Sequence, residues 1–441
     1  MKSREENDNN LIFSVLSVCS MVIMKFRDRY FCIRYEDNSV YKRQLPAIPG
    51  TIWTLGYVSL FMDLSSELVH SILPVFMVTV LGADALTIGL IEGIAEATSL
   101  IVKVFSGALS DFFSRRKWLI LAGYGLAALT KPLFPLASSV ETVFAARFLD
   151  RIGKGMRGAP RDALIADVAP LTIRGACFGL RQSMDTVGAV FGPLFAIVLL
   201  SFYHGDMKTV LWFAVVPAAI TIILIVFGVK EPAAKARPRQ FRSPLRLAFL
   251  KAFSRAYWRI VLIGAVFTLT RFSEAFLILR AEELGLSITW IPLVMVVMSL
   301  FYALSAYPAG VLSDHVRKEY LLATGLVLLA LADLVLARAN SILVVLCGVA
   351  LWGLHMGFTQ GILATMIANA TPRELKGTAF GLFNFVTGLF MLLASVIAGW
   401  LWDNYGSGMT FLAGAAFSVL ALMLLIFHKS PERATAQDPG T

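Results

Sequence analysis

One stretch of the sequence carries charged side chains in a pattern suited to ion pairing, proton transfer or the binding of a charged solute. RFLDRIGKGMRGAPRDALIAD, residues 147–167, contains five basic and three acidic residues, yet apolar runs long enough to cross a bilayer flank it. The spacing i, i+4, i+7, i+11 places four charges on one helical face, and these are Asp150, Lys154, Arg157 and Arg161. Arg147, Arg151 and Lys154 form an overlapping face. Because each charge is costly in lipid, we expect this helix to line a wet cavity or to pair with acids.

Candidate partners lie on the neighbouring apolar segments. Asp63, Glu67 and His70 are spaced i, i+4, i+7 and share a helical face, and Glu92 and Glu96 are spaced i, i+4. Further short-range pairs are Arg181 with Asp185 and Arg271 with Glu274. The second half of the chain is sparser, and its polar candidates are Trp352, His355, Gln360 and Asn384.

These charges have two interpretations. In the first, they form a structural ion-pair network, in which removal of one partner is costly. In the second, a carboxyl group carries a coupling proton and part of the basic face contacts a substrate, because burial and nearby cations shift a carboxyl pKa in opposite directions. The proton candidates are Asp63, Glu67 and Asp150. The substrate-cavity candidates are His70, Arg147, Arg151, Lys154, Arg157, Arg161, Arg271, Glu274, His355 and Gln360.

The elements that must position these residues are membrane-spanning helices. The 441-residue chain is 57% hydrophobic and 15% charged, whereas soluble domains carry about 25% charge, so a soluble enzyme is excluded. A spanning helix needs about 20 mostly apolar residues. Twelve windows fit, near 52–80, 86–109, 117–137, 140–166, 174–202, 209–229, 258–280, 287–312, 319–338, 341–367, 376–402 and 407–428.

The net charge of +10 is explained by topology. Lys and Arg gather before the first window and in every second connection, for example at 115–117, 230–259, 317–318 and 373–376. Positive residues remain on the cytoplasmic side. We therefore expect both termini in the cytoplasm, the lipid bilayer as a partner, and no nucleic-acid partner.

The chain repeats itself at a period of about 202 residues. GALSD (107–111) returns as GVLSD (310–314), and LIADVAPLTIRGACFGL (164–180) returns as MIANATPRELKGTAFGL (366–382). Parallel six-helix repeats are a known transporter design. We predict a cytoplasmic leader 1–49, a first bundle 50–229, a linker 230–257, a second bundle 258–428 and a cytoplasmic tail 429–441. Residues 1–23 are interpreted as an over-extended start or a disordered tail.

Three motifs resemble those of the major facilitator superfamily. GALSDFFSRRK (107–117) is similar to its signature between the second and third helices, RFLDRIGKG (147–155) to its fourth-helix pattern, and GAVFGP (188–193) to its fifth-helix antiporter motif. The resemblance implies an all-α membrane protein of twelve helices in two pseudo-symmetric bundles. It also implies a gating latch at Gly107, Asp111, Arg115, Arg116, Gly310 and Asp314. Gly188, Gly192 and Pro193 are expected to permit close helix packing.

Other classes of function find no support in the sequence. There is no Walker phosphate loop, no His-Glu-x-x-His and no Gly-x-Ser-x-Gly, and the four cysteines have no metal-ligand spacing. We therefore expect no enzyme activity, no cofactor and no metal. The expected function is monomeric, proton-coupled transport of a small organic solute across the bacterial inner membrane, with efflux by antiport favoured. Proton-linked uptake of an organic anion and a transport-inactive sensor or assembly factor remain alternatives.

Overall fold

The computed structural model describes residues 30–34, 40–44, 47–113, 115–231, 253–359, 362–371 and 375–426, which form a helical fold with one short hairpin. The first half contains α2 (Gly50–Thr79), α3 (Ala85–Phe113), α4 (Arg116–Thr130), α5 (Leu133–Leu136), α6 (Val140–Val168), α7 (Arg174–Phe202), α8 (Met207–Trp212) and α9 (Val215–Gly228). The second contains α10 (Arg255–Thr270), α11 (Ala275–Glu283), α12 (Leu293–His315), α13 (Lys318–Ala337), α14 (Ile342–Thr359), α15 (Ile362–Asn369), α16 (Lys376–Tyr405) and α17 (Ser407–Ile426). Single 3-10 turns, Leu171–Ile173 and Ile288–Trp290, precede α7 and α12.

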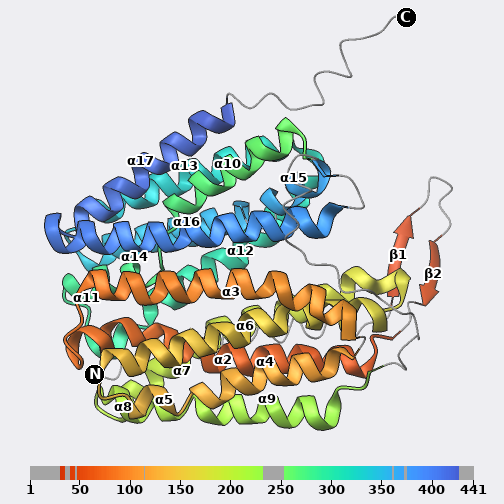
Figure 1. The fold of residues 1–441 in the computed structure, drawn as a ribbon, viewed down its shortest axis with the longest axis horizontal. Coiled ribbons are helices and arrows are strands. Elements are labelled where there is room, and N and C mark those ends of the chain that lie inside the picture. Colours follow the sequence, from red (N-terminus) through yellow and green to blue (C-terminus); the bar gives the residue numbers. More distant parts are fainter. Residues whose placement is uncertain are drawn as a thin grey trace, which may run out of the picture.

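The long helices run nearly parallel to one another in two adjoining bundles (Figure 1). Within the described ranges, eleven helical segments are long and apolar enough to cross a bilayer. The twelfth predicted span is α6, a helix of 29 residues with more charge than a simple apolar span. The predicted helical character of the charged stretch is therefore confirmed.

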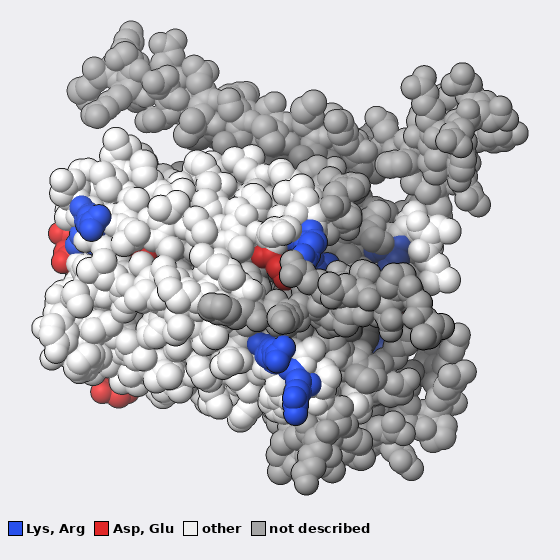
Figure 2. Space-filling model, turned by 90° about the horizontal axis from the view of Figure 1, so that it is seen from above, with Lys and Arg blue, Asp and Glu red and all other residues white. Residues whose placement is uncertain are grey.

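Apolar side chains cover the surface that would face lipid. Leu129, Phe202, Phe227 and Leu343 are all more than 70% exposed. In Figure 2 a broad uncharged band separates the charged residues near the left edge from those right of centre. Contiguous apolar surface of this kind marks a membrane-facing region.

Four local features differ from the expectation of twelve continuous helices. β1 (Tyr30–Arg34) and β2 (Val40–Gln44) form an antiparallel hairpin within the predicted leader. The window 258–280 is divided into α10 and α11 by residues 271–274. Turns at residues 131–132 and 213–214 interrupt the windows 117–137 and 209–229 in the same way. The predictions for residues 1–23, for most of the linker 230–257 and for the tail 429–441 lie outside the described residues.

The contacts in the two halves follow the same register. A Cβ on Gly123 of α4 would meet the Gly153 carbonyl and Arg157 of α6 at 2.8 and 2.9 Å. Gly325 of α13 lies against His355 and Thr359 of α14. A shift of 202 residues converts one set of contacts into the other, so the sequence repeat is also a structural repeat.

The two ends of the molecule differ in how the halves meet. At the end formed by Ala85 and Asp403, which we call the closed end, apolar side chains of both halves share one core that includes Phe76 and Phe276. The Asp403 carboxylate accepts hydrogen bonds from the Ala85 and Leu86 backbone N–H groups at 3.1 and 2.8 Å. At the opposite end the two halves have separate apolar cores.

That opposite end, called the basic end, carries Arg115, Arg116, Lys117 and Lys230. The Arg116 guanidinium lies 2.7 Å from the Asp167 carboxylate at the end of α6. The Arg116 backbone N–H donates to Glu231, which follows α9. These contacts connect the start of α4 with the end of α6 and with the segment after α9, at the basic end of the first bundle.

Gly188 and Gly192 bring α7 against α2, as their spacing predicts. A Cβ on Gly188 would collide with the Leu60 carbonyl oxygen, and one on Gly192 would lie 2.8 Å from the Leu64 carbonyl oxygen. The same two positions meet the Cβ atoms of Asp63 and Glu67 at 3.1 and 3.0 Å. The glycines therefore place α7 directly beside two of the proposed proton carriers.

We predict that Gly192→Val destabilises the protein by about 1–3 kcal/mol, because the added side chain collides with the α2 backbone. Thermal unfolding of purified protein, followed by the loss of monodisperse material on size exclusion, measures the effect. Gly175→Ala is the matched control on the same helix, since a Cβ there meets nothing within 4 Å. Equal stability of the two variants would contradict the close approach of α7 and α2.

Candidate functional site

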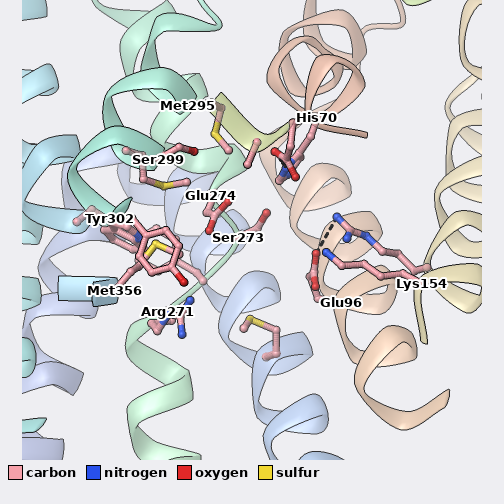
Figure 3. Close-up of a pocket in the computed structure, with 17 residues that line it drawn as sticks. His70, Glu96, Lys154, Arg271, Ser273, Glu274, Met295, Ser299, Tyr302 and Met356 are labelled. Atoms are coloured by element: carbon pink, nitrogen blue, oxygen red, sulfur yellow. Dashed lines mark ion pairs between the residues drawn. The ribbon is translucent and has the colours of Figure 1, made fainter. Parts of the chain in front are cut away.

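A cavity of about 330 Å³ lies between the two halves (Figure 3). The first half contributes Glu67 and His70 from α2, Glu96 from α3, and Arg151 and Lys154 from α6. The second half contributes residues 271–274, four residues of α12 and the α14 residues Trp352 and Met356. The volume suits a small organic molecule.

The break between α10 and α11 supplies the polar wall of the second half. Arg271, Phe272, Ser273 and Glu274 belong to neither helix and all line the cavity. The Ser273 N–H donates to the Ser395 hydroxyl of α16 at 3.3 Å, and the Ser273 hydroxyl accepts from the Ala275 N–H at 3.2 Å. Side chains thus satisfy backbone groups at the break, as an interrupted membrane helix requires.

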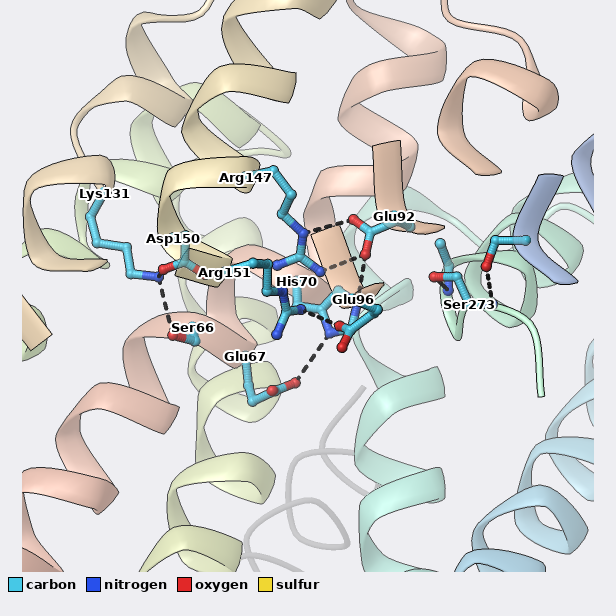
Figure 4. Close-up of polar contacts among 12 residues, drawn as sticks. Ser66, Glu67, His70, Glu92, Glu96, Lys131, Arg147, Asp150, Arg151 and Ser273 are labelled. Carbon is cyan, nitrogen blue, oxygen red and sulfur yellow. Dashed lines mark hydrogen bonds and ion pairs between the residues drawn. The ribbon is translucent and has the colours of Figure 1, made fainter. Parts of the chain in front are cut away.

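Ion pairs between α3 and α6 hold the first-half wall in place (Figure 4). Arg147 makes a bidentate pair with Glu92, with N–O distances of 2.8 and 2.6 Å, and both side chains are buried. One turn further along both helices, Arg151 lies 2.8 Å from Glu96. His70 of α2 lies 3.9 Å from Glu92 and 3.5 Å from Glu67. The structural interpretation of the network therefore fits Arg147, whereas Arg151 is both paired and exposed to the cavity.

The remaining charges of α6 do not share one wet face. Asp150 pairs with Lys131, just beyond α4, at 3.0 Å, and both side chains are buried. The Arg157 guanidinium lies 4.5 Å from the centre of the Tyr124 ring of α4. Arg161 reaches Ser59, Tyr124 and Asp162. Of the seven charges expected at membrane depth on α6, Arg147 to Asp162, only Arg151 and Lys154 line the cavity.

Three charged groups in the cavity wall are available to a ligand. Lys154, Arg271 and Glu274 form no ion pair with any other described residue, although all three line the cavity. Figure 3 shows Arg271 and Glu274 on one side of the cavity and Lys154 on the other. Together with Glu67, Glu96 and Arg151, they balance three carboxylates against three cations. The positive charge that α6 brings to the cavity is therefore balanced by carboxylates of the cavity wall. Of the three cavity groups without an ion pair among the described residues, two are cations and one is a carboxylate.

Asp63 lies outside this cavity wall but next to a second carboxyl group. On α2 it interacts directly with Asp185 of α7, and Asp185 is also 3.2 Å from Arg181. Two adjacent carboxyl groups favour the sharing of one proton, because both cannot be ionised without repulsion.

The other predicted site residues have varied surroundings. His355 is fully buried, with the rings of Phe267 and Trp352 each 6.0 Å away, and does not line the cavity. Gln360 and the side chains of Asp111 and Asp314 lie outside the described part of the structure. A Cβ on Gly107 would lie 3.5 Å from the Cβ of Ala159 of α6, and a Cβ on Gly310 would have room. Arg115 is exposed at the start of α4.

Sequence reasoning missed two buried charges, Lys131 and Asp333. Both are single charges inside otherwise apolar windows, and both are at most 1% exposed. The period of 202 residues aligns them with each other, which is a signal that the sequence already contains. The second half is sparser in charge, as expected, but it contains a buried carboxyl group that the sequence analysis did not single out.

A cavity between two pseudo-symmetric helical bundles, bordered by charges from both, defines the class of multi-pass membrane transporters. The family model described as Major Facilitator Superfamily matches residues 55–280 and 267–441. The chain belongs to the major facilitator superfamily, and it is a transporter rather than an enzyme.

Relatives and solved structures agree with this family. An uncharacterised MFS-type transporter of Methanocaldococcus jannaschii is 31% identical over 382 residues, covering 85% of this chain and 94% of that relative. The inner membrane transport protein YajR of Escherichia coli is 22% identical over 399 residues, covering 88% and 85%. Among solved structures, the nucleoside transporter NupG (D323A mutant) matches with a TM-score of 0.72 at 14% identity, covering 85% of this chain and 99% of its own.

We predict that Glu92→Gln destabilises the protein by about 3–5 kcal/mol, because it leaves the buried Arg147 cation without its counter-charge. Thermal unfolding measures the loss. Glu283→Gln is the matched control, since Glu283 also pairs with a buried arginine, Arg280, but is 43% exposed. Arg280 retains hydrogen bonds to Leu336, Ala339 and Ser407. The prediction is wrong if Glu92→Gln unfolds at the wild-type temperature.

Proposed function

We propose that the protein is a monomeric, proton-coupled secondary transporter that moves a small organic solute across the bacterial inner membrane by alternating access. The observation that carries the proposal is the cavity between the halves, where Lys154, Arg271 and Glu274 lie beside carboxyl groups but form no ion pair with any residue that the structure describes. Most of the other charged residues in the spanning helices have ion-pair partners that account for their presence there, but these three do not. Charges without partners at membrane depth are functional-site candidates.

The proposed orientation places the basic end and both termini in the cytoplasm. The clustering of Arg115, Arg116, Lys117 and Lys230 supports it through the positive-inside rule. The two halves meet in a shared apolar core at the closed end and have separate cores at the basic end. With this orientation, the structure corresponds to an inward-facing state.

Asp63 with its neighbour Asp185 is the preferred proton carrier, and Glu67 is the second candidate. Asp63 and Glu67 both lie on α2 where Gly188 and Gly192 of α7 press against it. A change in the access of water to this part of α2 between the two access states would change the affinity of Asp63 and Asp185 for a shared proton, because desolvation raises and hydration lowers a carboxyl pKa. Asp150 is a weaker candidate because its buried partner Lys131 keeps it away from the cavity.

Efflux by antiport is the proposed direction. The motif formed by Gly188, Gly192 and Pro193 resembles that of antiporters in this family, and its contacts with α2 support a role close to the proton site. The substrate is proposed to carry an anionic group, with Lys154 and Arg271 as its binding partners. A zwitterionic substrate would also use Glu274. The two unpaired cations equally favour the alternative function, proton-linked uptake of an organic anion.

Transport by the purified protein tests the function. In proteoliposomes with an imposed pH gradient, we expect gradient-driven flux of anionic or zwitterionic solutes and no flux of purely cationic ones. The direction of proton movement relative to the solute separates antiport from symport. Flux that is independent of the pH gradient would refute proton coupling. A complete lack of exchange across the solute panel would favour the sensor or assembly factor.

Within the same assay, we expect Asp63→Asn to lose gradient-driven flux while solute exchange continues, because the aspartyl pair can no longer bind and release a proton. Asp206→Asn is the matched control. Asp206 is an exposed carboxylate that caps α8, hydrogen bonds from Thr209 lower its pKa, and asparagine caps a helix equally well. Full gradient-driven flux in Asp63→Asn would exclude Asp63 as the carrier, and Glu67→Gln would then be the next variant.

The orientation is tested by labelling in intact cells, in a background without native cysteines. We expect a membrane-impermeant maleimide to label Asn340→Cys in the connection between α13 and α14, and to label Arg115→Cys only after permeabilisation. Both positions are exposed. The reverse pattern would invert the topology and would make the structure outward-facing.

A further inference from the structure

Asp333 of α13 is a carboxyl group for which the proposed mechanism has no role. Its side chain is 0% exposed, and neither carboxyl oxygen has a hydrogen-bond partner among the described residues. An ionised carboxylate in such surroundings is very costly, whereas a neutral carboxylic acid is tolerated. A structural role normally requires partners for a buried acid, and here none is made.

The structural repeat identifies the side chain that should face Asp333. A shift of 202 residues relates Lys131 to Asp333 and Asp150 to Trp352. Lys131 and Asp150 form a buried pair at 3.0 Å. In the second half the corresponding indole N–H of Trp352 is also buried and also lacks a partner. An acceptor and a donor at paired positions of the repeat are therefore both unsatisfied in this conformation.

Asp333 lies close to an aromatic side chain of the cavity wall. A Cβ on Gly414 of α17 would lie 2.5 Å from an Asp333 carboxyl oxygen and 3.0 Å from the Phe272 ring, so these two side chains converge there. Phe272 and Trp352 both line the cavity, with ring centres 5.4 Å apart. Because Phe272 belongs to the break between α10 and α11, no helical hydrogen bonding fixes its position.

Few other titratable groups are present around Asp333. The described residues of α17 include no ionisable side chain. On α14 the titratable groups are His355 and Cys347, and on α12 the described one is Tyr302. Arg280 of α11 is held by carbonyl groups at the end of α13 and by Glu283. Glu319 and Lys318 lie at the opposite end of α13 itself.

We propose that Asp333 is a second proton-binding site, located in the second bundle behind the wall formed by Phe272 and Trp352. When this wall opens, the carboxylic acid releases its proton to water in the cavity, and the indole N–H of Trp352 then donates a hydrogen bond to the resulting carboxylate. Rebinding of the proton breaks that hydrogen bond and restores the present arrangement. This inference rests on the proposed proton-coupled function and extends it to the second half of the protein.

The flux test compares Asp333→Asn and Asp333→Leu with wild-type protein in proteoliposomes. We expect both variants to lose gradient-driven flux and to keep solute exchange. Asp333→Leu is expected to unfold at or above the wild-type temperature, because an apolar side chain suits an apolar site. Asp206→Asn again serves as the control. Full gradient-driven flux in both Asp333 variants, with wild-type protein proton-driven, would overturn the inference and leave the proposed function intact.

A second readout does not depend on transport. Dicyclohexylcarbodiimide, which modifies protonated carboxyl groups in apolar surroundings, is added to wild-type protein in membranes, and labelled peptides are mapped by mass spectrometry. We expect modification of Asp333 at mildly acidic pH that fades at alkaline pH, with no modification of the exposed Asp206. If the wild type shows no proton-driven flux, the proposed function fails but labelling of Asp333 still supports a protonatable site. Absence of label at every pH would overturn the inference independently.

Discussion

The structure depends on the neutralisation of charge inside a lipid-embedded helix. α6 carries more charge than a simple apolar span, and it is accommodated because its neighbours supply the counter-charges. Arg147 is matched by Glu92 with two short hydrogen bonds in a site that is almost wholly buried. Asp150 is matched by Lys131 through one hydrogen bond of 3.0 Å between buried side chains. Without these pairs, a helix of this composition would not be stable at membrane depth.

The two bundles use different physical means to surround one cavity. In the first bundle, ion pairs and glycine contacts fix α3, α6 and α7 relative to α2. In the second, the cavity wall consists of a helix break, thioether side chains and the aromatic cluster around Phe272 and Trp352. Methionine side chains adapt more readily to ligands of different shape than paired charges do. The first bundle is therefore suited to fixed recognition of charge, and the second to rearrangement.

Much of this architecture could be predicted from the sequence, and the missing parts have physical reasons. Apolar length and the repeat of 202 residues predict the helices and their pairing into halves. The spacing of Gly188 and Gly192 predicts a close contact, although it does not identify α2 as the partner. Helical periodicity placed Asp150, Lys154 and Arg157 on one face, but Asp150 and Arg157 contact Lys131 and Tyr124 at α4, whereas Lys154 lines the cavity. The break at residues 271–274 contains no proline or glycine, so no local signal marked it. Lys131 and Asp333 were overlooked because a lone charge barely alters the hydropathy of an apolar window.

The contact between Asp403 and the beginning of α3 has a consequence for the energetics of opening. The carboxylate occupies two backbone N–H groups that the first turn of any helix leaves unsatisfied. Those N–H groups lie near the surface, so water can replace Asp403 as soon as the bundles separate there, and the exchange leaves no polar group unpaired. The contact thus favours a single alignment of the two halves while adding little to the barrier against parting them. The contact therefore fixes the relative position of the two halves without holding them together strongly. The apolar core behind it must supply most of the resistance to opening on that side of the membrane.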